Sequence, residues 1–398
     1  MTKFDETIPT LNIIMCGHID HGKTTLLHKL SGRWTDTHSE ELKRGITIRL
    51  GYADILLSKD HSGINRENKG TPLRYVSFVD APGHEMLMAT MLSGAAIVDA
   101  AILVVAANEG IKPQTREHLI ALQAKRINHA IIIQNKIDLV TKEQARANYE
   151  ALKKLVHNTI AQNAPIIPVS AQQEVNIDKI YEALCAIPTP ERNTTGDPLF
   201  IVARSFDINK PGTTPDTLNG AVLGGTLKQG TLKVGDEIEI KPGLAIKEAN
   251  HLSYKTLKTK VRALFKGSHK LDYITPGGSM SIETELDMSL GKADALSGAI
   301  VSHIGKLPEP AYTLAMKYKL FDQMLGTQQQ TAVDPIKPNE MLLLSINTSV
   351  SVGTVKKIKN NEAELALRIP IVPFKGENIA IARNVNNHWR LIGHGEVI

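Results

Sequence analysis

The sequence predicts a doubly wound α/β domain with a mostly parallel sheet, followed by two antiparallel β-barrel domains. Its first half alternates short apolar segments with amphipathic helical ones, which is the pattern of a parallel sheet covered by helices on both faces. A glycine turn that ends in Lys23 and Thr24 follows the first apolar segment, as it does in phosphate-binding loops. The second half is richer in Gly, Thr and Val, and its short alternating runs favour barrels.

The elements can be placed in order along the chain. The expected strands of the α/β domain are Leu11–Cys16, Leu73–Val79, Ala101–Ala106, Ala130–Gln134 and Pro165–Val169. A linker rich in Pro, Thr and Gly spans residues 188–198 and marks a domain boundary. A second boundary near Gly305–Pro310 divides the rest into two barrels of ordinary domain size. We therefore expect a nucleotide domain at 1–192 and barrels at 197–308 and 309–398.

Composition limits the class of protein. The chain has 398 residues, of which 42% are hydrophobic and 22% charged, as in folded globular proteins. The two cysteines, Cys16 and Cys185, are far apart, which favours reduced thiols in the cytoplasm. No signal peptide is evident at the N-terminus, and the most apolar window, Ala95–Ala107, is too short to cross a bilayer. We expect no membrane association, and a net charge of +5 permits an RNA partner without requiring one.

The glycine turn Gly17–Thr24 reads Gly-His-Ile-Asp-His-Gly-Lys-Thr and ends a strand. Backbone N–H groups of such a turn point at phosphate oxygens, and the positive end of the next helix lies at the same place. The contacts with nucleotide phosphates are expected at Asp20, His21, Gly22, Lys23, Thr24 and Thr25.

A second phosphate signal, Asp80 to His84, follows the Leu73–Val79 strand. The Asp80 carboxylate is suited to hold magnesium through water, and the Gly83 N–H is suited to contact the terminal phosphate. Asp-Ala-Pro-Gly by itself is an ordinary β-turn. Its position relative to Lys23 favours the phosphate interpretation.

The base is indicated by two further strand ends. Two hydrogen bonds from the guanine edge suit a carboxylate at Asp138, and adenine would leave this acceptor unpaired at a cost of about 1–3 kcal/mol. The stem of Lys136 would lie along the base, and Asn135 would brace the loops. An N–H at Ala171 is placed to donate to the guanine O6. The expected base contacts are Asn135, Lys136, Asp138, Ser170, Ala171 and Gln172. The predicted ligands are therefore GTP and GDP.

The segment before residue 54 contains a possible sensor of the γ-phosphate. The Thr47 hydroxyl can meet magnesium and its N–H the γ-phosphate, so the segment would order with GTP and loosen with GDP. Thr47 also alternates with Ile46 and Ile48 as in any strand, and the residues alone leave both interpretations open. The expected Mg²⁺ ligands are Thr24, Thr47 and Asp80, with Asp20 as an additional carboxylate or a simple turn former.

Several segments resemble the gamma subunit of archaeal and eukaryotic translation initiation factor 2. The stretch Trp34–Asp54 is similar to the first switch of that family. Further similar segments are Asp80–Glu85, Pro113–His118, Asn163–Pro168, Arg204–Gly212 and Trp389–Gly395. Elongation factor Tu shares the Arg44–Thr47 and Pro82–His84 cores but lacks the stretches 34–41 and 204–212. The resemblance implies a P-loop GTPase domain followed by two β-barrels.

The resemblance also implies a function. The GTP form would carry methionylated initiator tRNA to the small ribosomal subunit, as the core of a heterotrimer with alpha and beta subunits. Activating or exchange proteins would be further partners. Tyr52 resembles a tRNA-contacting position of the family, whereas Trp34 and Trp389 are expected to be packing residues.

Catalytic roles follow the same resemblance. Lys23 would neutralise the β- and γ-phosphates, and Thr47 would complete the magnesium site. His84 stands where a water-orienting residue is expected, and Ile19 and Ile46 match a pair of apolar residues that screen that water. The alternative for His84 is packing or capping of the next helix.

One departure from the family concerns zinc. Many archaeal relatives carry four cysteines between the first switch and the Asp80 strand, but residues 58–72 contain no cysteine and one histidine, His61. A closed zinc site needs four Cys or His ligands. We expect no zinc, and we expect a flexible surface loop in this interval.

Two other functions stay open. An elongation-type carrier of aminoacyl-tRNA would bind elongator tRNA as a single chain, and the 34–41 stretch argues against it. A regulatory GTPase subunit of a metabolic complex, such as a sulfate-activating enzyme, would bind no tRNA. The basic residues of the barrels do not decide between these functions, since solvated barrel faces carry such residues too.

Overall fold

The α/β domain contains a mostly parallel sheet in the computed structural model. The model describes residues 5, 7–35, 47–210, 212–214, 217–248, 251–324 and 331–398. The strand order is β3-β2-β4-β1-β5-β6-β7, in which β4, β1, β5, β6 and β7 are parallel neighbours. The strands are β1 (Thr10–Gly17), β2 (Gly51–Asp60), β3 (Gly63–Asn65), β4 (Thr71–Asp80), β5 (Ala100–Ala106), β6 (His129–Asn135) and β7 (Ile166–Pro168). All the predicted strands of this domain are confirmed.

Helices cover both faces of this sheet. They are α1 (Lys23–Ser31), α3 (Met88–Ala95), α4 (Pro113–Ala124), α5 (Lys142–Val156) and α6 (Ile177–Ala186), with short 3₁₀ turns η1 (Glu85–Leu87) and η2 (Ile137–Leu139). Apolar side chains of α3, α4 and α5 pack on one face around Leu103 and Ile132. Those of α1 and α6 pack on the other face around Ile13 and Val104. The doubly wound fold predicted from the alternation is confirmed.

The expected flexible loop at residues 58–72 is wrong. Strand β2 continues to Asp60 and pairs with β3, with Ser58 opposite Asn65, and β4 begins at Thr71. The turn is stabilised locally, because Oδ1 of Asp60 accepts hydrogen bonds from the Ser62 N–H at 2.8 Å and from the Ser62 hydroxyl. Polar composition concealed this hairpin, since an exposed strand extension needs no apolar alternation.

The first barrel closes through pairing of β11 with β12. Its ring runs β11-β16-β8-β9-β15-β12 around a core that includes Phe200 and Leu264. The ring strands are β8 (Leu199–Phe206), β9 (Val222–Gln229), β11 (Glu237–Glu248), β12 (His251–Lys266), β15 (Met280–Thr284) and β16 (Ile300–His303). The short strands β10 (Leu232–Lys233), β13 (His269–Leu271) and β14 (Tyr273–Ile274) and the turn η4 (Met288–Asp294) complete it.

The second barrel is also closed, in the order β17-β22-β21-β20-β23-β24. Its strands are β17 (Ala311–Leu320), β20 (Met341–Ile346), β21 (Ser349–Lys359), β22 (Glu362–Ile371), β23 (Asn378–Val385) and β24 (His388–Val397). A small pair, β18 (Gln323–Met324) with β19 (Thr331–Ala332), lies outside the ring. We propose the domain boundaries 1–192, 197–308 and 309–398, because they leave the sheet and both rings intact.

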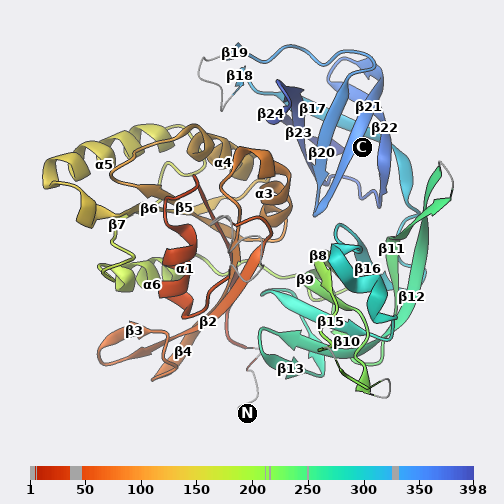
Figure 1. The fold of residues 1–398 in the computed structure, drawn as a ribbon, viewed down its shortest axis with the longest axis horizontal. Coiled ribbons are helices and arrows are strands. Elements are labelled where there is room, and N and C mark those ends of the chain that lie inside the picture. Colours follow the sequence, from red (N-terminus) through yellow and green to blue (C-terminus); the bar gives the residue numbers. More distant parts are fainter. Residues whose placement is uncertain are drawn as a thin grey trace.

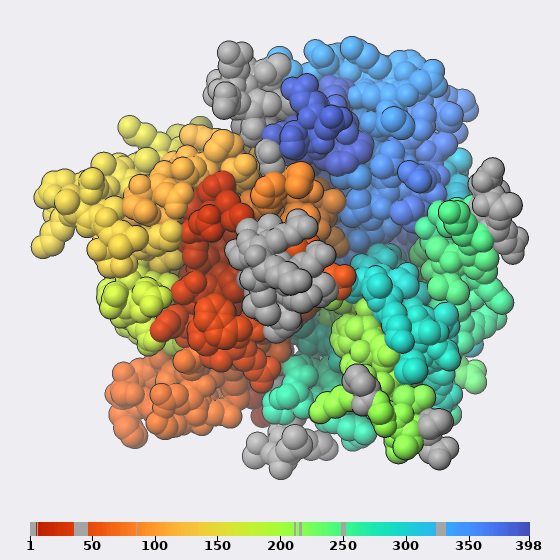
Figure 2. Space-filling view, in the orientation of Figure 1, coloured from red at the N-terminus to blue at the C-terminus, as the bar shows by residue number. Residues whose placement is uncertain are grey.

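The two barrels pack beside the α/β domain (Figure 1). The second barrel lies against the helical surface of that domain, and its blue surface meets the orange one in Figure 2. This interface is polar as well as apolar. Arg390 of β24 forms an ion pair of 2.7 Å with Glu117 of α4, and the Ser93 hydroxyl donates to the Thr348 carbonyl at 3.1 Å. In the part of the chain that the structure describes, no helix is long and apolar enough to span a bilayer.

Candidate functional site

The phosphate loop occupies the connection between β1 and α1. Gly17 has φ of 135°, and a Cβ there would lie 2.2 Å from the Val104 carbonyl oxygen. Gly22 has φ of 85°, and a Cβ there would lie 2.5 Å from Nδ2 of Asn135. Both positions therefore need glycine for conformation and for space. The Asp20 backbone is left-handed too, with φ of 61°.

A cavity of about 420 Å³ opens over this loop. It brings together the phosphate loop, Trp34 after α1, Thr47 ahead of β2, the turn after β4 and the turn after β6. The lining residues are Ile19, Asp20, Gly22, Lys23, Thr24, Thr25, Trp34, Thr47, Gly83, His84 and Lys136. Most of these lie in the turns after β1, β4 and β6 or in the first turn of α1, at the carboxyl-terminal edge of the sheet where open α/β sheets bind ligands.

Three predicted magnesium ligands meet at one end of the cavity. The Thr24 hydroxyl donates to Oδ2 of Asp80 at 2.9 Å and lies 3.2 Å from the Thr47 hydroxyl. Thr35, which the sequence did not single out, also donates to Asp80, at 2.8 Å. Asp80 is fully buried and Thr47 is 8% exposed. Hydroxyl and carboxylate oxygens are the ligands Mg²⁺ prefers, so this donor set fits the ion.

Lys23 and Asp20 frame the phosphate side of the same cavity. The Lys23 ammonium donates to the His18 carbonyl at 2.9 Å, which holds the side chain across its own loop. His21 points away from the cavity, because its ring Nδ1 lies 3.2 Å from the Val104 carbonyl oxygen. Burial lowers the His21 pKa to about 4, so its ring is neutral at pH 7. A contact of His21 with phosphate would therefore be made by its backbone N–H and not by its side chain.

Asn135 joins the two loops that would surround the base. Its Nδ2 donates to the His21 carbonyl at 3.0 Å, and its Oδ1 accepts from the Ala171 N–H at 3.1 Å. The Ala171 amide is thus engaged by Asn135, and contact with guanine O6 would have to share or replace this bond. Ser170 is buried and its hydroxyl accepts from the Gln173 N–H at 3.2 Å.

The remaining base residues lie around the turn after β6. Lys136 has φ of 60°, and its ammonium lies 3.5 Å from Oε1 of Glu109. Asp138 is in η2 and is exposed, as is Gln172 in the turn after Ser170. The exposed Asp138 carboxylate, two residues after the cavity-lining Lys136, is accessible to an incoming base.

His84 lines the cavity and also caps η1. Its Nδ1 accepts a hydrogen bond from the Met86 N–H at 3.3 Å. The capping role considered from the sequence is therefore what this structure shows. Ile46, which would screen the attacking water together with Ile19, lies outside the described residues, as does the rest of the segment 36–46.

His118 supports the phosphate loop, a role that the sequence does not predict. The Gly17 N–H donates to Nδ1 of His118 at 2.9 Å. Burial lowers the pKa of His118 to about 3, so the ring stays neutral and keeps its acceptor. His118 is the last residue of Pro113–His118, one of the segments that resemble the initiation factor 2 gamma family.

The packing role expected for Trp34 is wrong. Its side chain is 57% exposed and lines the phosphate cavity. The indole stacks on His28 of α1, with ring centroids 4.1 Å apart and an interplanar angle of 16°. The exposed end of α1 offers no apolar core at this place, so the ring covers the helix surface instead.

Tyr52 lies on β2 at the junction with the first barrel. It lines a separate cavity of about 220 Å³ together with Phe206, Gly224 and Met280. Its hydroxyl is buried, and burial raises the pKa of Tyr52 above its usual range. The pocket is therefore formed by residues of both domains and has apolar and polar groups in its wall.

Comparisons with known proteins agree with this geometry. Residues 8–189 match the family "Elongation factor Tu GTP binding domain", and residues 312–397 match "Initiation factor eIF2 gamma, C terminal". The chain is 48% identical to the translation initiation factor 2 subunit gamma of Methanococcus maripaludis, over 98% of each chain. It is also 48% identical to the protein of the same name from Archaeoglobus fulgidus, over 98% of this chain and 94% of that one.

Solved structures show the same fold at lower identity. A bacterial selenocysteine-specific elongation factor has a TM-score of 0.76 at 23% identity, over 98% of this chain and 58% of that one. Elongation factor SelB from Methanococcus maripaludis, in complex with the GTP analogue GppNHp, has a TM-score of 0.73 at 22% identity, over 99% of this chain and 80% of that one.

The relatives at 48% identity span nearly the whole chain, and the GTP-binding family covers the cavity described above. The protein is thus a translational GTPase that binds guanine nucleotide. The chain belongs to the family of translation initiation factor 2 gamma subunits.

Proposed function

We propose that the GTP form of this protein binds methionylated initiator tRNA and delivers it to the small ribosomal subunit. The protein would act as the core of a heterotrimer with alpha and beta subunits in the cytoplasm, and it would release the tRNA after GTP hydrolysis. The relatives are named as gamma subunits of translation initiation factor 2, which supports both the partners and the process. The observation that carries the proposal is that Thr24 contacts both Thr47 and Asp80 at the wall of the nucleotide cavity.

That arrangement can distinguish GTP from GDP. Thr24 comes from the phosphate loop and Asp80 from the end of β4, and both are held by the sheet. Thr47 lies ahead of β2 and outside the sheet, so the 3.2 Å approach of its hydroxyl to Thr24 depends on how residues 47–50 are held. Mg²⁺ supplies charge neutralisation between the β- and γ-phosphates when bound. A γ-phosphate gives the Thr47 N–H a partner that GDP does not offer.

The residues of the chain have distinct roles in hydrolysis. Lys23 places its ammonium beside the phosphate oxygens, and loop N–H groups, including that of Gly83, stabilise charge on the transferring group. His84 orients the attacking water once the His84 ring has broken its hydrogen bond with the Met86 N–H. This contact is a weak neutral hydrogen bond of 3.3 Å, so a partner can break it at small cost. Hydrolysis would accordingly depend on an activating partner.

Tyr52 and its pocket are the proposed site for the aminoacylated end of the tRNA. The pocket lies where β2, which follows the Thr47 segment, meets the first barrel. Phe206 and Met280 supply apolar surface, and unstacked bases and apolar side chains bind such platforms. A pocket formed by two domains is sensitive to how those domains dock, and so to the bound nucleotide.

The test is a titration of labelled Met-initiator tRNA and of an elongator tRNA. Each is added to the full chain with its alpha and beta subunits, with GppNHp or with GDP. Initiator-selective binding in the GppNHp state supports the proposal. Equal affinity for both tRNAs would favour an elongation-type carrier of aminoacyl-tRNA. Absence of tRNA binding with either nucleotide would favour a regulatory subunit of a metabolic complex.

A further inference from the structure

The first barrel contacts Arg49 and Leu50, which lie shortly after Thr47 in the chain. Arg204 of β8 donates from Nη1 to the Leu50 carbonyl at 2.9 Å and from Nε to Oδ1 of Asp294 at 2.7 Å. The other oxygen of Asp294 lies 3.4 Å from Nη1 of Arg49. Two consecutive residues of the α/β domain are therefore held by one guanidinium and one carboxylate of the barrel.

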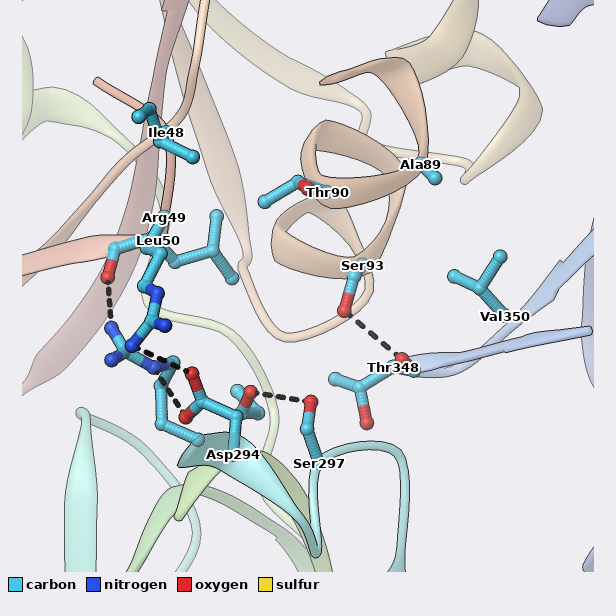
Figure 3. A pocket seen from close by; sticks show the side chains of 12 residues that line it. Ile48, Arg49, Leu50, Ala89, Thr90, Ser93, Asp294, Ser297, Thr348 and Val350 are labelled. Atoms are coloured by element: carbon cyan, nitrogen blue, oxygen red, sulfur yellow. Dashed lines mark hydrogen bonds and ion pairs between the residues drawn. The ribbon is translucent and has the colours of Figure 1, made fainter. Parts of the chain in front are cut away.

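These contacts line a cavity of about 380 Å³ where the α/β domain and both barrels meet. Figure 3 shows the Arg49 guanidinium beside Asp294, with Ser93 bonded to Thr348 of the second barrel on the far side. Arg49 and Leu50 lie just before β2, and the Leu50 side chain packs in the apolar core. The Leu50 carbonyl and the Arg49 guanidinium face the barrel instead, where Arg204 and Asp294 hold them through polar contacts.

Asp294 lies in a turn of the first barrel that has an unusual backbone conformation. Ala293 and Asp294 have φ of 54° and 61°, which is left-handed for two consecutive non-glycine residues. Such residues cost free energy and persist where their surroundings hold them. The Ser205 N–H helps to hold this turn, since it donates to Oδ1 of Asp294 at 3.1 Å. The result is a carboxylate oriented toward Arg204 and Arg49.

Leu50 links these barrel contacts to the position of Thr47 in the nucleotide cavity. Its side chain is 4% exposed in the core of the α/β domain, and a Cβ on Gly94 would lie 2.8 Å from it. Leu50 is three residues from Thr47, a span of at most about 11 Å in an extended chain. A shift of the Leu50 carbonyl therefore changes where Thr47 can reach.

We propose that Arg204 is a positioning residue that holds Thr47 over the nucleotide cavity, so that preference for GTP over GDP depends on docking of the first barrel. This inference rests on the proposed role of Thr47 toward magnesium and the γ-phosphate. By thermodynamic linkage the dependence is reciprocal, and GTP stabilises the docked barrel more than GDP does.

The test compares affinities for GppNHp and GDP in the full chain. Arg204→Met keeps the aliphatic stem and removes the donors. It should weaken GppNHp binding about tenfold relative to GDP, which corresponds to about 1.4 kcal/mol. GDP affinity should stay within about twofold of the unmodified chain, because GDP does not use Thr47. Asp294→Asn keeps the shape of the clamp and should give a smaller loss, about threefold.

A matched control is Arg192→Met. Arg192 forms a two-pronged pair with Asp99 at 2.8 and 2.6 Å, remote from the Thr47 segment. This variant should leave the ratio of the two affinities unchanged. Equal weakening of both nucleotides by Arg204→Met, or no weakening, would overturn the inference.

Thr47→Ala separates the inference from the proposed function. If Thr47→Ala lowers GppNHp affinity and Arg204→Met does not, the inference fails and the role of Thr47 stands. If Thr47→Ala itself leaves the ratio unchanged, both fail. If both variants lower the affinity for GppNHp relative to GDP, the double variant Thr47→Ala/Arg204→Met should lose little more of this relative affinity than Thr47→Ala does. The reason is that the two residues act through one contact. Additive losses would contradict the positioning role.

Discussion

A buried ion pair joins the second barrel to helix α4, and breaking it should loosen that interface. The guanidinium of Arg390 lies 2.7 Å from Oε1 of Glu117, and the two residues are 9% and 2% exposed. Arg390→Met leaves the Glu117 carboxylate buried with its charge no longer balanced by Arg390. The free energy of unfolding should fall by about 3–5 kcal/mol, the usual cost of removing one member of a buried pair. Arg390→Met combined with Glu117→Leu should recover most of this loss, since apolar replacement of both partners is often neutral.

Urea unfolding followed by tryptophan fluorescence measures these changes. Trp389 lies next to Arg390 on β24, and a Trp34→Phe background makes it the single tryptophan, since the chain has 2. The control is Arg126→Met, which breaks the ion pair with Glu396 across the same interface. The side chains of Arg126 and Glu396 are 54% and 40% exposed, so the free energy of unfolding should fall by less than about 1 kcal/mol. Losses in the Arg390 and Glu117 single variants that simply add in the double variant would refute the reasoning.

Three further predictions concern the nucleotide site and the domain junction. Asp138→Asn should shift base preference from GTP toward XTP, measured by competition binding, and unchanged preference would remove Asp138 from base recognition. His84→Ala should keep GTP affinity but slow partner-stimulated hydrolysis by about 10²-fold or more, and unchanged single-turnover rates would exclude a catalytic role. Lys125 donates to the Ser345 carbonyl at 3.1 Å, and burial, with the nearby Lys228 ammonium, lowers its pKa from 10.5 to about 7. The unfolded chain then binds more protons than the folded one between pH 7 and 10.5, so this group makes stability rise with pH there. Lys125→Met should remove up to about 1.4 kcal/mol per pH unit of that slope, and parallel stability curves of the two proteins would disprove the shift.

Much of the α/β domain could be predicted because its signals are local. Strands buried on both faces are continuous apolar runs, and each predicted run became a strand within a residue or two of its expected bounds. The hairpin at 58–72 was missed because an exposed extension carries no such run. Trp34 was misassigned because burial is decided by what surrounds a ring, and the end of α1 leaves it uncovered. His118 gave no signal of its own, since a lone histidine in a helix does not reveal that its ring will meet a glycine N–H 101 residues away in sequence.

The sequence by itself determined the chemistry available to the nucleotide. The glycines of the phosphate loop follow from stereochemistry. The residue types at Lys23, Asp80 and Asp138 are those that the hydrogen-bonding groups of phosphate and guanine would require, and this argument needs no knowledge of packing. Only the tertiary structure decided how that chemistry is coupled to the barrels. Arg204 and Leu50 are 154 positions apart, and no periodicity in the chain indicates that they meet. Such contacts arise from docking of separately folded surfaces, so they become visible when the domains are seen together.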